Sequence, residues 1–100
     1  MELQALNIPA TRLAEFCRRH HVQRLSLFGS FLRGAARADS DVDLLVEFEP
    51  GQVPTLFGLA RMELELSDLF GHPVDLRTAE DLSKYFRREV RDVARVLFAA

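Results

Sequence analysis

Residues 41–49, DVDLLVEFE, constrain the fold more than any other segment because apolar side chains recur there at every second position. Side chains alternate between the two faces of a β-strand, so this spacing predicts a strand. One face would carry Val42, Leu44, Val46 and Phe48, and the other would carry Asp41, Asp43, Leu45 and Glu47. The segment therefore predicts a sheet that buries its apolar face and presents two carboxylates, two residues apart, on the opposite face.

The segments on either side of this strand alternate between helical and extended patterns. Helical patterns cover about residues 9–20, 30–36 and 54–70. Runs of β-forming residues predict two further strands at residues 22–28 and 74–76. Each of these short strands is separated from the central one by a predicted helix, which is the pattern of a sheet covered by helices.

A last helix is predicted from Thr78 onward, opened by a Thr-x-x-Asp cap that pairs Thr78 with Asp81. Its inner stripe would consist of Leu82, Phe86, Val90, Val93 and Leu97. The resulting order, α-β-α-β-α-β-α, predicts an α/β (α+β) domain with a small mixed sheet of three main strands covered by helices. At 100 residues the chain has the size of one domain, so residues 1–100 are expected to form a single unit.

The composition excludes several classes of protein. No apolar run approaches the roughly 18–20 residues that a membrane span needs, and the first residues lack the layout of a signal peptide, which predicts a cytoplasmic protein. Cys17 is the only cysteine, so neither an internal disulfide nor a cysteine-based zinc site is expected. Residues 39–76 hold nine acidic residues against one basic residue, Arg61, a net charge of −8. Such a surface suits cations rather than phosphates, so direct nucleic-acid binding is not expected.

Asp41, Asp43 and Asp75 are the candidate metal ligands. Asp41 and Asp43 leave the same face of the predicted strand, and Asp75 joins them if its own short strand lies alongside. Carboxylates placed so close raise one another's pKa, and a hard divalent cation such as Mg²⁺ would neutralise them. The alternative is that alternating acids merely mark the solvent-facing side of a strand, which is the more common meaning of an isolated Asp-x-Asp.

The turn at Gly29 and Ser30 favours a metal site over that alternative. It follows a predicted strand and precedes the Asp pair. Backbone N–H groups at such a turn, together with the serine hydroxyl, form a cradle for an anion. Phosphate beside a metal site suggests a metal-bound nucleotide. A P-loop is excluded because Ala35 and Ala36 replace its Lys and Ser or Thr, and no GxGxxG motif is present.

The run LFGSFLRGAARADSDVDLLVEFE resembles the active-site signature of the DNA polymerase beta-like nucleotidyltransferases, and most of all that of the minimal nucleotidyltransferases. HPVDLRT resembles the segment that carries the family's third carboxylate, here Asp75. The resemblance covers nearly the whole chain and implies the nucleotidyltransferase fold. It also implies that Asp41, Asp43 and Asp75 are catalytic residues that bind Mg²⁺, and that Gly29 and Ser30 hold the nucleotide phosphates.

Arg33 and Arg37 lie between the Gly-Ser turn and the Asp pair. Guanidinium groups bind phosphate oxygens in a bidentate geometry, so both residues are candidate phosphate contacts. The alternative is a pair of exposed arginines on a short helix.

The resemblance further implies a reaction and a partner. A hydroxyl would attack the α-phosphate of ATP and release pyrophosphate, with two Mg²⁺ ions per site and Mn²⁺ as a substitute. The acceptor would be a hydroxyl, expected to be a tyrosine, of a HEPN-type ribonuclease toxin, and the chain would be the antitoxin of a type VII-like toxin–antitoxin module that forms a hetero-oligomer with that toxin. Two alternatives remain open: an antitoxin or scaffold that acts by binding alone, and nucleotidyl transfer to a small molecule or RNA.

Overall fold

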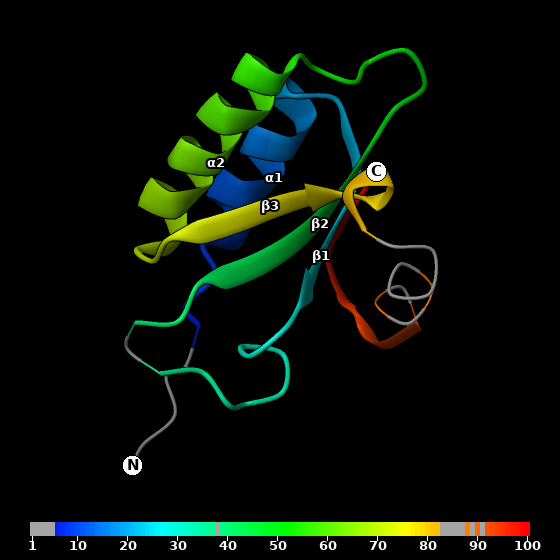
Figure 1. The fold of residues 1–100 in the computed structure, drawn as a ribbon. Helices are drawn as coiled ribbons and strands as arrows, with labels where there is room; N and C mark the ends of the chain where they lie inside the picture. Colours follow the sequence, from blue (N-terminus) through cyan, green and yellow to red (C-terminus); the bar gives the residue numbers. More distant parts are fainter. Residues whose placement is uncertain (1–5, 38, 83–87, 89, 91) are drawn as a thin grey trace.

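The computed structural model describes residues 6–37, 39–82, 88, 90 and 92–100. Within these ranges the chain forms a four-stranded mixed sheet with two α-helices packed against one face (Figure 1). The strands are β1 (Val22–Phe28), β2 (Val42–Phe48), β3 (Val74–Thr78) and β4 (Arg95–Ala99), in the spatial order β3-β2-β1-β4. β1 runs antiparallel to both β2 and β4, whereas β2 and β3 are parallel.

The two helices, α1 (Ala10–Arg19) and α2 (Leu56–Phe70), confirm two of the predicted helices. The Thr55 hydroxyl accepts a hydrogen bond from the Gly58 N–H at 3.1 Å, which caps the start of α2. α2 ends at Gly71, whose φ of +70° lies in the left-handed region that glycine adopts without strain. Because α2 connects two parallel neighbouring strands, it is the crossover that such a pairing requires.

The larger hydrophobic core lies between the helices and the sheet. Its fully buried side chains come from α1, from β1 and β2, and from the inner stripe of α2; among them are Leu13, Phe16, Val42, Leu44, Val46, Met62 and Leu66. Cys17 belongs to this core, and burial raises the pKa of its thiol to about 12, so it is not a reactive thiol. The predicted apolar face of β2 is therefore confirmed.

A second, smaller core covers part of the opposite face of the sheet. Leu45 is only 1% exposed there and packs with Phe28, Leu82 and Val90, with Leu32 at the margin. The face that carries the carboxylates is thus not simply a solvent face. On β2 this face carries both Leu45, which belongs to the smaller core, and Asp43, which pairs with Asp75.

Side chains of α2 complete the free edge of β3. The Leu76 N–H donates to Glu63 Oε2 at 2.8 Å, and the Val74 N–H donates to Ser67 Oγ at 3.0 Å. The Ser67 hydroxyl in turn donates to the Glu63 carbonyl oxygen at 2.8 Å. These bonds satisfy edge amides that would otherwise be open to another strand, and they fix the position of Asp75, which lies between the two bonded amides.

The predicted helix over residues 30–36 is wrong. This segment is a succession of turns, held by bonds from the Arg33 N–H to the Gly29 carbonyl at 3.1 Å and from the Ala35 N–H to the Ser30 carbonyl at 2.9 Å. Gly34 has a φ of +70°, which ends any right-handed helical turn at that point. Arg33 therefore extends from a turn rather than from a helix.

The predicted final helix is wrong at its end. Residues 95–99 form β4, which pairs with β1 in antiparallel orientation, so Leu97 lies in a strand and the sheet has four strands rather than three. β1 would otherwise leave one row of backbone groups unpaired, and the β-forming run RVLFA satisfies them. Of the predicted inner stripe, Leu82 and Val90 are buried, Val93 is 62% exposed, and Phe86 lies outside the described residues.

In the described ranges no helix has both the length and the apolar character needed to cross a membrane.

The Thr78–Asp81 cap is confirmed, since Asp81 Oδ2 accepts hydrogen bonds from the Thr78 N–H and hydroxyl, each at 3.0 Å. It opens a short 3₁₀-helix, Ala79–Asp81. These hydrogen bonds hold the pKa of Asp81 below its usual range.

Candidate active site

Asp43 and Asp75 are direct neighbours in the sheet. The parallel register of β2 and β3 pairs Asp43 with Asp75, as it pairs Val42 with Val74. Because Val42 and Val74 point into the larger core, the two aspartates leave the opposite face. The structure therefore brings together two carboxylates that lie 32 positions apart in the sequence.

Gly29 lies directly against the Asp43 carboxylate at the end of β1. Phe28, the last residue of β1, pairs with Asp43, so the next residue turns over that side chain. A Cβ atom at Gly29 would stand 2.0 Å from Asp43 Oδ2, a distance that no atom can occupy. The φ of Gly29 is +77°, so both its conformation and its surroundings require glycine.

Asp43 has an environment that opposes its negative charge. Burial raises its pKa, and the carboxylates of Asp75 and Asp41 raise it further, whereas Arg77 and Arg33 lower it. Asp41 is exposed and lies immediately before β2. Unbalanced negative charge of this kind, carried by hard oxygen donors, fits a divalent cation.

No three His, Cys, Asp or Glu side chains of the described residues converge closely enough to hold a metal ion. Asp75 instead contacts Arg77, whose Nε–H donates to Oδ1 at 3.0 Å and whose Nη2–H donates to Oδ2 at 3.2 Å. The residue types and their common face suit a metal site, but Asp75 is bound to a cationic side chain of the protein itself.

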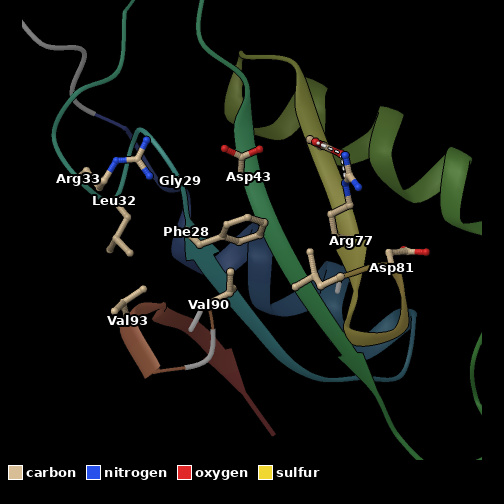
Figure 2. A pocket seen from close by; sticks show the side chains of 11 residues that line it. Phe28, Gly29, Leu32, Arg33, Asp43, Arg77, Asp81, Val90 and Val93 are labelled. Atoms are coloured by element: carbon tan, nitrogen blue, oxygen red, sulfur yellow. Dashed lines mark hydrogen bonds and ion pairs between the residues drawn. The ribbon is translucent and has the colours of Figure 1, made fainter. Parts of the chain in front are cut away.

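An open cavity of about 670 Å³ adjoins these residues (Figure 2). Its polar side consists of Gly29, Arg33, Asp43, Asp75, Arg77 and Asp81, and its apolar side consists of Phe28, Leu32, Leu82, Val90 and Val93. The size lies within the range of small-molecule sites. A ligand that fills this cavity would have a charged end toward the carboxylates and an apolar or aromatic end toward the smaller core.

We expect the metal-free protein to lose stability as the pH rises through the titration of Asp43. The pKa of Asp43 is raised above the ordinary value of 3.8, so the folded protein holds this proton more tightly than the unfolded chain does. The stabilisation is complete below the unfolded pKa and is lost as the pH rises through the folded pKa.

Asp43→Asn should remove this dependence. With EDTA at pH 7, the variant should be more stable than the wild type by about 0.2–1 kcal/mol, the range of one cross-strand charge pair. Urea unfolding of both proteins at pH 4 and pH 7 measures the difference. A marked loss of stability in the variant at pH 7 would show instead that the carboxylate supports the fold.

A family model described as a nucleotidyltransferase domain matches residues 11–97 of the chain. The chain belongs to this family. The protein adenylyltransferase MntA of Thermococcus cleftensis is 44% identical over 62 residues, which is 62% of this chain and 61% of that protein. A solved structure named "putative minimal nucleotidyltransferase" is 41% identical, with a TM-score of 0.71 and 85% of each chain covered. The predicted family and fold are thereby confirmed.

A toxin–antitoxin structure with AMP-PNP has a TM-score of 0.76 against this nucleotidyltransferase domain. The match covers 93% of this chain and 75% of that chain, at 19% identity. At this identity the similarity shows a shared fold.

Only some of the site residues predicted from the sequence line the cavity of the nucleotidyltransferase domain. Gly29, Arg33, Asp43 and Asp75 line it, whereas Ser30, Arg37 and Asp41 are not among its lining residues. Ser30 follows Gly29 directly in the turn. The Arg37 N–H donates to Ser40 Oγ at 2.7 Å, and the Arg37 side chain is exposed.

Sequence reasoning missed Arg77 and the apolar side of the cavity. A signal for Arg77 was present, since it follows Asp75 by two residues on a strand and must therefore share its face. The apolar side had no such signal, because Phe28, Leu82 and Val90 come from three separate segments.

Proposed function

We propose that this nucleotidyltransferase domain is a Mg²⁺-dependent protein adenylyltransferase. It transfers AMP from ATP to a hydroxyl, expected to be a tyrosine, of a HEPN-domain ribonuclease toxin, and is the antitoxin of a type VII-like module that forms a hetero-oligomer with that toxin. The observation that carries this proposal is the pairing of Asp43 with Asp75 beneath the Gly29 turn, at one end of a cavity that fits a nucleotide. The 44% identity to a protein adenylyltransferase supports it.

The carboxylates are assigned to the metal. Asp43 and Asp75 share one face of the sheet, and Asp41 lies two residues before Asp43. Two bound Mg²⁺ ions, or Mn²⁺ in their place, would supply Lewis acidity to the acceptor hydroxyl and charge neutralisation to the triphosphate. The raised pKa of Asp43 supports this assignment, because burial and the carboxylates of Asp75 and Asp41 oppose its negative charge and a bound cation would favour it.

The turn after β1 is assigned to the phosphates. Gly29 brings the backbone of the turn against Asp43 without a side chain between them. Backbone N–H groups of such a turn, together with the Ser30 hydroxyl, are donors suited to phosphate oxygens. Arg33 lines the cavity and is exposed, which leaves its guanidinium able to reach a phosphate oxygen. Arg37 lies farther along the same segment and is a secondary candidate.

The apolar side of the cavity is assigned to the adenine ring. Phe28, Leu82 and Val90 form a buried surface next to the acidic pair, and a flat aromatic ring can pack against it. With the ring there, the triphosphate extends toward Gly29 and the carboxylates. The acceptor oxygen then forms a bond to the α-phosphorus, the bond to the bridging oxygen of the β-phosphate breaks, and pyrophosphate leaves with its electron pair while a site carboxylate takes the hydroxyl proton.

Label from α-labelled ATP is expected on the partner protein, whereas γ-labelled ATP should leave it unlabelled, because the inner phosphate is the one attacked. The experiment incubates the purified chain and its toxin partner with Mg²⁺ and either form of ATP, followed by gel separation. EDTA should abolish labelling. Label from γ-labelled ATP would indicate a kinase, and label only on RNA or a small molecule would favour the alternative acceptors.

A further inference from the structure

Arg77 forms an ion pair with Asp75, one of the carboxylates that the proposed reaction needs for a metal ion. Arg77 follows Asp75 by two residues on β3, so both side chains leave the same face of the strand. The guanidinium donates to both Asp75 oxygens, from Nε at 3.0 Å and from Nη2 at 3.2 Å. This is the bidentate geometry that makes arginine–carboxylate pairs specific.

A divalent cation and Arg77 compete for Asp75. Both carboxylate oxygens already accept hydrogen bonds from a positive group, and a metal ion at the same oxygens would be repelled by it. Arg77 lines the same cavity as Asp43 and Asp75, so its single positive charge offsets part of their negative charge in the absence of metal. Arg77 therefore takes the place that a cation would otherwise fill.

The Arg77–Asp75 ion pair can break at a modest cost in free energy. The Arg77 and Asp75 side chains are 46% and 35% exposed, and ion pairs at such exposure are weak. Arg77 lines the same cavity as Arg33. A guanidinium released from Asp75 thus stays beside the space assigned to the triphosphate, where phosphate oxygens offer it the same bidentate contact.

We propose that Arg77 is a positioning residue that exchanges Asp75 for a nucleotide phosphate, so that metal and nucleotide enter the site together. This inference rests on the proposed function. Without nucleotide, Arg77 holds Asp75 and weakens the binding of a free divalent cation. When the metal–nucleotide complex enters, Asp75 turns to the metal and Arg77 turns to a phosphate oxygen.

The experiment measures Mn²⁺ binding with and without AMP-PNP by calorimetry, on the full chain without its partner. In Arg77→Gln, Mn²⁺ alone should bind roughly two- to five-fold more tightly, as expected when an exposed ion pair is removed. AMP-PNP in the presence of Mn²⁺ should bind about tenfold more weakly, because a charge-assisted phosphate contact is lost. The cooperativity between the two ligands should therefore fall. Arg77→Lys keeps the positive charge but cannot make the bidentate contact, so its cooperativity should lie between those of the wild type and Arg77→Gln.

Arg24→Gln is the matched control. Arg24 also lies on a strand and pairs with a carboxylate, Glu47, at 3.9 Å, but it does not line the cavity. This variant should leave both affinities unchanged. Equal cooperativity in wild type and Arg77→Gln, or weaker Mn²⁺ binding in the variant, would overturn the inference while leaving the proposed function intact. Absence of Mn²⁺ and nucleotide binding in the wild type would overturn both.

Discussion

Asp43→Asn is expected to lower AMP transfer to the partner by a factor on the order of 10²–10³ or more, because the variant loses a carboxylate that we propose holds the metal ions at the reacting phosphate. Asp43 is the carboxylate on which the site converges: it pairs with Asp75, lies under Gly29 and lines the cavity. The loss should appear in the initial rate of labelling from α-labelled ATP. Asp41→Asn should act in the same direction.

Asp39→Asn is the matched control for this loss. It removes the same charge from an exposed residue of the same acidic segment, outside the residues that line the cavity. Transfer should continue at the wild-type rate. Co-elution with the partner should persist in all three variants, since the metal site and the docking surface need not coincide. If Asp43→Asn neutralises the partner fully in cells, then binding alone is the mechanism.

Gly29→Ala should be as damaging to transfer, for a steric reason. The new Cβ would lie 2.0 Å from Asp43 Oδ2 and 2.9 Å from its Cγ, so either the turn or the carboxylate must move. A displacement of about 1 Å in a reacting group is enough for a loss on the order of 10²-fold. The positive φ adds a folding cost of about 1 kcal/mol. Initial rates of labelling and urea unfolding measure the two effects.

Gly51→Ala separates these two costs. Gly51 has nearly the same φ, +78°, and nothing lies within 4 Å of the place its Cβ would take. It should therefore lose stability from backbone strain alone and keep full activity. If Gly29→Ala proved no worse than Gly51→Ala in transfer, the close approach of Gly29 to Asp43 would have no catalytic importance.

The alternation of side chains along each strand predicted which face of that strand carries the aspartates. Asp41 and Asp43 were placed on one side of β2, and Asp75 opposite Val74 and Leu76, from spacing alone. The register that sets Asp43 beside Asp75 was not predictable in this way, because it depends on how α2 returns the chain to the sheet. The bonds from the Val74 and Leu76 amides to α2 help to fix that register.

β4 shows where local patterns fail. The five residues RVLFA suit a helix stripe or a strand almost equally, and the unpaired side of β1 decides between them. The same limit applies to Leu45, which alternation placed with the acids. It is buried because Phe28, Leu82 and Val90 converge on it from distant segments.

The crossover through α2 gives the site an order of assembly. β1 and β2 are consecutive strands that pair in antiparallel orientation and are joined by residues 29–41, so Gly29 and Asp43 can meet before the rest of the chain has folded. Asp75 joins them when β3 pairs with β2 in parallel, and a contact of this larger sequence separation is expected to form more slowly. A nascent or partly unfolded chain would thus possess a phosphate turn without its full set of acids. Capacity for chemistry would be gained only once β3 has paired with β2, and it would be lost whenever β3 detaches.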